Sequence, residues 1–422
     1  MQTKLAPQYQ GSADGAAAES ILRKCVHCGF CTATCPTYQL LGDELDGPRG
    51  RIYLIKQVLE GQPPTRKTQL HLDRCLTCRN CETTCPSGVD YGHLVDIGRK
   101  MVDAKVPRPA KEKVLRWALK EGLSSPLFAP AMRVGQWLRP MLPRALQNKV
   151  PRLQSAGVWP HRLHARKMLL LAGCVQPAMM PNINFATARV LDAAGVQTLL
   201  APAAGCCGAL KFHLNDQAGA MVQMRANIDA WWPYLDGDGA VEAIVMNASG
   251  CGVTVKEYGH ILRDDPAYAQ RASRVSALTR DLSELLPDLV SPLAGKLDAA
   301  RVRNAAGKEA SETIAFHPPC TLQHGQQLRG VVEQHLGALG FKLRVAVNES
   351  HLCCGSAGTY SVLNPDIAQQ LRDRKLEKLA ELAPALIVSA NIGCISHLQS
   401  GTATPVRHWV ELLDQALIAQ PR

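Results

Sequence analysis

The stretch KCVHCGFCTATCP, residues 24–36, decides how the first part of this chain folds, because it places four cysteines within thirteen residues. A second stretch, RCLTCRNCETTCP at residues 74–86, repeats the same spacing 50 residues later. In both stretches three cysteines follow one another as C-x2-C-x2-C, and a fourth comes after three further residues, directly before a proline. The sequence therefore predicts two sites that need sulfur at fixed spacing.

This spacing is typical of two-cluster ferredoxins, in which the fourth cysteine of each motif ligates the other [4Fe–4S] cluster. We therefore expect two [4Fe–4S] clusters with exchanged fourth ligands. The first is predicted to take Cys25, Cys28, Cys31 and Cys85, and the second Cys75, Cys78, Cys81 and Cys35. A pair of zinc sites is the alternative, but zinc sites use two C-x2-C pairs separated by a longer loop.

The C-terminal part of the chain contains an internal repeat of cysteines. A lone cysteine, an adjacent pair and a last cysteine occur twice: Cys174, Cys206, Cys207 and Cys251, then Cys320, Cys353, Cys354 and Cys394. The lone and last cysteines follow short apolar runs such as MLLLAGC, and helical patterns such as NINFATARVLDAAGV lie between them. This alternation predicts parallel α/β modules whose cysteines lie in loops where strands end.

The eight repeated cysteines are candidate ligands of additional metal or iron–sulfur sites, because all four positions recur. Thiol redox chemistry and a structural use are the alternatives, although adjacent cysteines rarely bond each other. His317 and His351 precede cysteines of the second module, and they either tune a site there or pack locally.

We predict an α+β multidomain protein with a mainly helical N-terminal domain and two repeated α/β modules. Helices are expected at residues 51–61 and about 91–104. The predicted parts are a flexible tail at 1–20, a ferredoxin-type domain at 21–105, a basic, proline-rich helical linker at 106–166, and cysteine-rich modules at 167–290 and 291–422.

The net charge of +11 is concentrated in one segment. Residues 100–167 hold fifteen lysines and arginines but three acidic residues, so the charge does not indicate a nucleic-acid-binding protein. Two amphipathic helices are predicted here, KEKVLRWALKEGL and AMRVGQWLRPMLP, and the segment carries Trp117, Trp137 and Trp159. It forms a peripheral membrane contact, a partner interface or a solvated linker.

Several common sequence motifs and targeting segments are absent from the sequence. We find no dinucleotide-binding G-x-G-x-x-G, no P-loop, no H-E-x-x-H, no signal peptide and no membrane-spanning apolar run. A cysteine-rich chain without a secretion signal is typical of metal or redox proteins. We expect a chain that relays electrons and has no catalytic residue of its own, with the flavin on a partner.

The repeated modules resemble the cysteine-rich domain of heterodisulfide reductases. In that family the last element is usually C-x-x-C, and this chain has Ala248 and Asn391 at the earlier position, so each module keeps four of five cysteines.

From about residue 20 to its end, the chain resembles the iron–sulfur subunits of glycolate oxidases. The resemblance rests on stretches that extend beyond the cysteines, among them KCVHCGFCTATCPTYQLLGDELDGPRGRIYLIK, DRCLTCRNCETTCPSGVDYGHLVDIGR, LAGCVQPAMMPNINFATARVL, PPCTLQHGQ and ESHLCCGSAGTYSVLNP. It implies separate FAD-binding subunits that oxidise glycolate to glyoxylate, and a quinone or another respiratory acceptor. It also implies a cytoplasmic complex, peripheral on the inner face of the inner membrane.

Three other functions are left open by the residues themselves. The first is the equivalent subunit of a D-lactate or glycerol 3-phosphate dehydrogenase, because the partner flavoprotein sets the substrate. The second is a thiol–disulfide reductase of the heterodisulfide type. The third is a zinc-stabilised scaffold or nucleic-acid binder.

Overall fold

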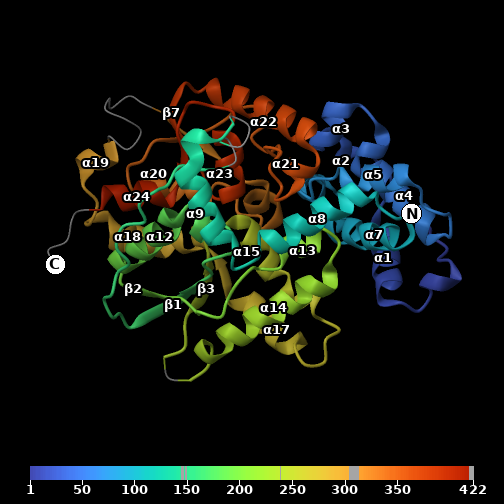
Figure 1. Cartoon of the computed structure of the whole chain (residues 1–422), viewed down its shortest axis with the longest axis horizontal. Helices are drawn as coiled ribbons and strands as arrows, with labels where there is room; N and C mark the ends of the chain where they lie inside the picture. The colour runs from blue at the N-terminus through green and yellow to red at the C-terminus, as the bar shows by residue number, and fades with distance from the viewer. Residues whose placement is uncertain (144–146, 148–149, 238, 304–312, 418–422) are drawn as a thin grey trace.

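The structure is a computed structural model that describes residues 1–143, 147, 150–237, 239–303 and 313–417. The N-terminal helices lie at one end of the long axis, and two sheet-containing modules fill the other end (Figure 1). The predicted α+β multidomain organisation is confirmed.

The N-terminal domain is helical and surrounds its own apolar core. Both helices predicted here are present, and α4 begins earlier than expected because Pro48 suits the first position of a helix. A Cβ at Gly98 would lie 2.5 Å from Ile55 Cγ1, so α7 packs closely on α4 only with glycine there. The elements are η1 (Pro7–Tyr9), α1 (Ala13–Lys24), α2 (Phe30–Ala33), α3 (Pro36–Leu41), η2 (Glu44–Asp46), α4 (Pro48–Leu59), α5 (Arg66–Asp73), α6 (Asn80–Thr84) and α7 (Tyr91–Lys105).

Residues 1–20, where we expected a flexible tail, are packed against this domain. Ser12 Oγ accepts a hydrogen bond from Gly15 N and so caps α1. Ala18 and Leu22 of α1 are fully buried, and the amino group of Met1 donates to the carbonyl of Cys25 at 2.7 Å. The expectation rested on small, polar composition, whereas an N-cap followed by apolar residues at helical spacing accounts for the observed helix.

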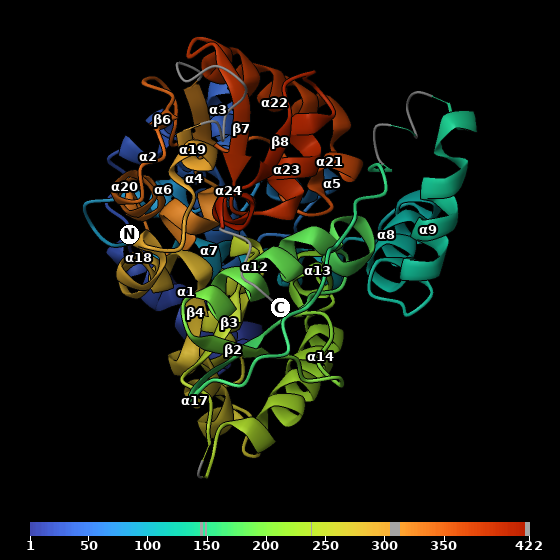
Figure 2. The same ribbon diagram turned by 90° about the vertical axis from the view of Figure 1, so that its left-hand side faces the viewer.

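The linker contains two helices near the predicted positions, α8 (Ala110–Gly122) and α9 (Phe128–Leu138), followed by η3 (Arg139–Met141). Ion pairs connect the linker to both neighbouring parts of the chain. Arg108, just before α8, pairs with Asp73 of the N-terminal domain at 2.6 Å, and Lys120 of α8 pairs with Asp216 of the first module at 2.8 Å. Both helices lie along one side of the molecule (Figure 2). None of the helices in the described ranges is long and apolar enough to span a bilayer.

The two modules contain parallel sheets with the same strand order, β2-β1-β3-β4 and β6-β5-β7-β8. This confirms the predicted repeat of parallel α/β units. The first module comprises β1 (Arg166–Leu170), α11 (Gln176–Met179), α12 (Pro181–Ala193), β2 (Val196–Leu199), α13 (Ala209–His213), α14 (Gln217–Trp231), η4 (Trp232–Tyr234), β3 (Ala243–Met246), α15 (Ser249–Lys256), α16 (Tyr258–Ile261), α17 (Ala269–Leu278), β4 (Thr279–Asp281), η5 (Leu282–Leu285) and α18 (Leu286–Ala294). The second comprises α19 (Ala299–Arg303), β5 (Thr313–His317), the π-helical turn η6 (Thr321–Gly325), α20 (Val331–Ala338), β6 (Leu343–Val345), α21 (Tyr360–Leu363), α22 (Pro365–Ala380), β7 (Pro384–Ser389), α23 (Ile392–Gln399), β8 (Val406–His408) and α24 (Val410–Ala416).

The last helix of each module packs on the other module. Helix α18 contacts α20, and α24 contacts α12, where Arg189 pairs with Asp414 at 2.7 Å. One hydrophobic core therefore includes residues of both sheets. Our expected boundary between residues 290 and 291 falls inside α18, because the cysteine repeat locates the modules but not the helix that crosses between them.

Candidate functional site

The first ferredoxin motif and Cys85 surround one small pocket near the surface. Cys25, Cys28, Cys31 and Cys85 all line it. Burial and, after it, the neighbouring thiols of Cys25, Cys85 and Cys28 raise the pKa of the Cys31 thiol to about 11. Cys85 therefore lies beside the first motif, and Cys81 of the second motif also lines the pocket.

The two cysteine loops share an unusual backbone. The residues two and four positions after the first cysteine have positive φ in both loops: His27 at 59° and Gly29 at 87°, then Thr77 at 52° and Arg79 at 58°. Non-glycine residues rarely adopt this conformation, and such strain is concentrated at functional sites. In the second loop the bend aims the amide of Thr77 at Cys75 Sγ, 3.4 Å away.

The second motif and Cys35 form a more deeply buried group. Burial is the main reason that the pKa values of the Cys78 and Cys81 thiols are raised well above normal, and Cys75 and Cys35 add to both shifts. Tyr91 Oη donates towards Cys75 Sγ at 3.6 Å. Cys35 therefore lies close to the thiols of the second motif.

Two buried arginines lie beside this second group. Arg51, which is 1% exposed, has Cys75 and Cys35 among its charged surroundings. Arg99 donates from Nη2 to the carbonyl of Cys75 at 2.6 Å and from Nη1 to Thr77 Oγ1 at 2.9 Å. These positive charges favour anionic ligands at Cys35 and Cys75.

A fully buried carboxylate anchors Arg51. Asp46 accepts from Arg51 Nη2 at 3.5 Å and from Arg74 Nη1 at 2.8 Å, and its Oδ1 lies 3.0 Å from His71 Nδ1. Thr37, next to Cys35 in space, also accepts from Arg51 at 3.2 Å. The network ties α3, α4 and α5 together around the second group of cysteines.

The four cysteines of the first module converge from three loops at the ends of strands. The thiols of Cys174 and Cys207 donate to Cys206, which lowers the pKa of Cys206 and raises the pKa values of the two donors. Cys251, in α15, interacts with Cys207 and Cys174. Tyr258 Oη donates to the carbonyl of Cys207 at 2.8 Å and so stabilises the loop that carries Cys206 and Cys207.

The cysteines of the second module converge in the same way. Cys320 Sγ lies 3.8 Å from Cys353 Sγ. Cys354 and Cys394 lie with His317, and their ligand atoms are all within 4.8 Å of one another. Burial lowers the pKa of His317 well below its usual range.

The second module also contacts the second ferredoxin group directly. The charge of Cys320 contributes to the raised pKa of Cys78, and both residues lie in one apolar cluster with Cys353 and Leu76. Tyr360 Oη donates to the carbonyl of Arg74 at 2.9 Å. No sequence pattern indicated this contact between residues about 240 positions apart.

A cavity of about 1560 Å³ opens onto the second ferredoxin motif and the cysteines of both modules. Its lining includes cysteines of the second ferredoxin motif and of both modules, together with apolar residues of the linker such as Leu119 and Phe128. The linker thus forms part of the wall around the cysteine sites.

The two candidate histidines have different positions. His317 lies in the cysteine site of the second module, whereas the carbonyl of His351 accepts from Asn80 at 3.3 Å at the contact with the ferredoxin domain. The sequence reasoning missed Arg51, Arg99 and Lys375 as charges near the cysteines. Lys375 is buried, and although burial lowers its pKa to about 8, Cys354 and Cys353 oppose that shift. A basic residue inside an otherwise apolar helix pattern was the available signal for Arg51.

Family profiles match both parts of the chain. A profile described as "4Fe-4S dicluster domain" matches residues 21–89, and one described as "Cysteine-rich domain" matches residues 168–256 and 314–399.

Curated relatives match over long stretches. The chain is 54% identical over 419 residues to "Glycolate oxidase iron-sulfur subunit" of Escherichia coli (strain K12), covering 99% of both chains. It is 28% identical over 412 residues to "Probable glycolate oxidase iron-sulfur subunit" of Bacillus subtilis (strain 168), covering 91% of this chain and 89% of the relative. It is also 28% identical over 261 residues to "Lactate utilization protein A" of Geobacillus thermodenitrificans (strain NG80-2), covering 59% of this chain and 98% of the relative.

Proposed function

This chain belongs to the family of glycolate oxidase iron–sulfur subunits, and from that premise we propose that it is the electron-transfer subunit of a flavin-linked glycolate dehydrogenase. A partner FAD-binding subunit oxidises glycolate to glyoxylate, which releases two electrons and two protons. The flavin divides this two-electron oxidation into single-electron steps. The observation that carries the proposal is the match at 54% identity over 99% of the chain.

The residues present fit two [4Fe–4S] clusters. Each candidate site has four thiols, three from one motif and one from the other: Cys25, Cys28, Cys31 and Cys85, then Cys75, Cys78, Cys81 and Cys35. When bound, the clusters would accept and release single electrons. The chain's own contribution is to supply thiolates, to exclude water from the second site, and to place Arg51 and Arg99 beside it. Positive charge and N–H or O–H donors near the sulfurs favour the reduced, more negative state.

The candidate sites form a series through the molecule. The first lies near the surface, with Cys28 exposed, and the second is buried against Cys320 and Cys353 of the second module. We place the flavoprotein contact at the first site, where the apolar side chains of Val26 and Phe30 are 67% and 61% exposed. Phe30→Glu should then reduce co-purification of the flavoprotein subunit, while the iron content stays unchanged.

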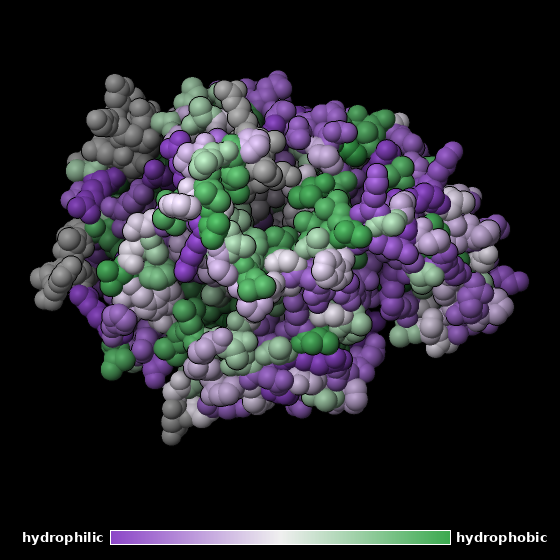
Figure 3. Space-filling model, viewed as in Figure 1, coloured by the Kyte–Doolittle hydropathy of each residue, from purple (hydrophilic) through white to green (hydrophobic). Residues whose placement is uncertain are grey.

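The linker helices are the proposed contact with the inner face of the inner membrane, where a quinone is the proposed acceptor. Trp117 and Trp137 are 61% and 80% exposed, and apolar residues gather over α8 and α9 on the face shown in Figure 3. Exposed tryptophan beside Lys113 and Arg133 fits an anionic lipid surface. Flotation with anionic liposomes tests this contact: the wild type should float and the Trp117→Glu/Trp137→Glu variant should not. Flotation of both proteins alike would refute it.

The decisive experiment is anaerobic co-purification with the flavin subunits, followed by addition of glycolate. The clusters should become reduced, as seen by EPR. If glycolate reduces the flavin while the clusters stay oxidised, the relay is refuted.

A D-lactate-linked subunit is the second candidate, because 59% of the chain also matches a lactate utilization protein. Parallel additions of glycolate, D-lactate and glycerol 3-phosphate separate these substrates: reduction by D-lactate alone would overturn the glycolate assignment and keep the relay.

A further inference from the structure

We propose that His317 is a metal ligand in the second module, where its imidazole joins the thiolates of Cys354 and Cys394 around one transition-metal ion. This inference concerns the chemistry of the module itself and does not depend on which substrate the partner oxidises. It adds a ligand that the pattern of repeated cysteines does not contain.

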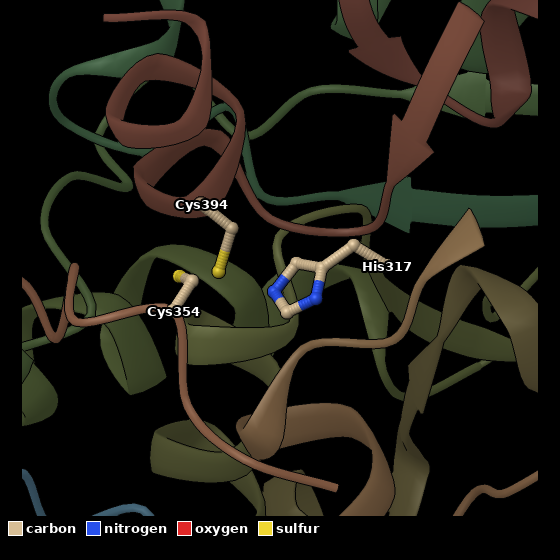
Figure 4. Close-up of side chains that lie close together, drawn as sticks. All are labelled: His317, Cys354 and Cys394. Atoms are coloured by element: carbon tan, nitrogen blue, oxygen red, sulfur yellow. The ribbon is translucent and has the colours of Figure 1, made fainter. Parts of the chain in front are cut away.

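The three side chains come from separate elements and point toward one another (Figure 4). His317 ends strand β5, Cys354 lies in the loop between β6 and α21, and Cys394 lies in the first turn of α23. Their ligand atoms lie within 4.8 Å of one another. Ligands bound to a single tetrahedral ion at roughly 2.0–2.3 Å lie about 3.3–3.8 Å apart, so a small inward adjustment completes such a site.

The imidazole of His317 lacks any other partner. The residue is 1% exposed, and both ring nitrogens are buried without a hydrogen bond. Among the histidines of the described ranges, no other has both nitrogens in this state. Because buried polar atoms nearly always have a partner, an orphaned imidazole with one ring nitrogen near two thiols indicates a missing ligand bond.

The backbone around His317 is held firmly. Ser389 Oγ donates to the carbonyl of His317 at 2.9 Å, and β5 pairs with β7 at the same residues. This places the imidazole at the carboxyl end of the sheet, beside the helix that carries Cys394. The side chain is therefore positioned by the sheet and not by a mobile loop.

The other group of metal-type ligands in the described ranges does not carry the same inference. Asp43, Asp46 and His71 also lie within 4.8 Å of one another. However, Asp46 is already paired with Arg51 and Arg74. These two cations neutralise the carboxylate and leave no need for a metal ion.

The first module lacks this ligand. Leu171 stands three residues before Cys174, as His317 stands three residues before Cys320. Leu171 is 3% exposed and can only pack. At this position the two modules therefore differ, with leucine in the first and histidine in the second.

Imidazole with thiolates suits a lone zinc ion, and it equally suits one iron of a cluster that uses Cys320 and Cys353 as further ligands. Both sources share the same ligand chemistry. Lys375 is buried close to Cys353 and Cys354 and would offset the extra negative charge of four thiolates.

The test compares metal content in full-length protein purified anaerobically. The variants are His317→Ala, His317→Cys and, as control, His408→Ala, which removes another buried histidine of the same module. We expect His317→Ala to lose zinc or iron relative to the wild type, His317→Cys to recover the metal, and His408→Ala to match the wild type. Circular dichroism and gel filtration check the fold of each variant.

The two metal sources give different results. Loss of about one zinc per chain indicates a lone ion, whereas loss of iron, with a nitrogen coupling in pulsed EPR of the wild type that disappears in His317→Cys, indicates an iron of a cluster. Unchanged zinc and iron in folded His317→Ala would overturn the proposal, whether or not glycolate reduces the protein. Equal metal loss in folded His408→Ala would also overturn it, because the loss would then reflect packing.

Discussion

The exchange of fourth ligands between the two ferredoxin motifs can be tested by pairing cysteine substitutions. Cys35 is 7% exposed and lies close to Cys78 and Cys81, although only three residues separate it from Cys31. If Cys35 belongs to the second site, Cys35→Ala and Cys78→Ala damage the same cluster, and Cys31→Ala damages the other. Two substitutions at one site should then cause no more loss of iron than one, whereas the losses from substitutions at separate sites should add.

The expected magnitudes follow from this grouping. Each [4Fe–4S] site holds about four irons, so each single variant should lose about four irons per chain relative to the wild type. The double variant Cys35→Ala/Cys78→Ala should still lose about four, and Cys31→Ala/Cys35→Ala should lose about eight. Using differences from the wild type removes the contribution of any iron in the modules.

The assay is iron and acid-labile sulfide per chain in anaerobically purified protein, with EPR of the dithionite-reduced sample. Cys28→Ala/Cys31→Ala serves as the folding control, because both residues belong to one site under either assignment and only about four irons should be lost relative to the wild type. The reverse pattern would refute the exchange: about four irons lost in Cys31→Ala/Cys35→Ala and about eight in Cys35→Ala/Cys78→Ala.

Three further predictions concern the charges around these sites. Asp46→Asn should destabilise the protein by ~3–5 kcal/mol, because it leaves the buried cation of Arg51 without its carboxylate, and a loss below ~1 kcal/mol in denaturant unfolding would contradict this. Arg51→Met should lower the reduction potential of the second site by on the order of 50–100 mV, since Coulomb's law at an effective dielectric of about 20 gives ~1–3 kcal/mol for a unit charge within ~10 Å. Redox titration followed by EPR measures this, and an unchanged potential would show that Arg51 is too well screened to act. The contact of His93 with Glu257 at 2.7 Å, between the ferredoxin domain and the first module, should weaken as pH rises. Burial lowers the pKa of His93, but the hydrogen bond and charge of Glu257 raise it more, so this stabilisation is complete below about pH 6.5 and is lost as the pH rises through the folded-state pKa. The protection of α7 amides against hydrogen exchange, relative to the intrinsic rate at each pH, should therefore be lower at pH 8.5 than at pH 6 in the wild type. This difference in protection should shrink in His93→Gln, and an equal difference in both proteins would contradict the prediction.

Much of the fold could be predicted because its signals are local. The apolar runs before Cys174, Cys251, Cys320 and Cys394 predicted buried strands, and β1, β3, β5 and β7 lie there. The spacing of the cysteines predicted which thiols would meet in each module, since strand ends of a parallel sheet share one edge. Helix α4 was visible from Ile52, Ile55 and Leu59, which are all buried.

The rest depends on contacts between distant segments. Nothing in the sequence near Cys320 indicates that it lies beside Cys78, and the role of Arg51 depends on an aspartate from another element. His317 was noted beside a cysteine, but only the folded chain distinguishes its buried, unpartnered ring from the linking role of His351. Such properties arise from tertiary packing, which local pattern does not contain.

The packing of helices α18 and α24 on the opposite modules bears on how far the two modules can differ. Two repeated halves that each pack their last helix on the other are comparable to the subunits of a symmetric dimer, in which both subunits present the same surfaces. In a dimer of identical chains any substitution appears at both sites at once. Fusion of the two copies into one polypeptide removes that constraint, so that histidine can stand before Cys320 while leucine stands before Cys174. One covalent chain thus lets the two cysteine sites differ while the modules share a single core.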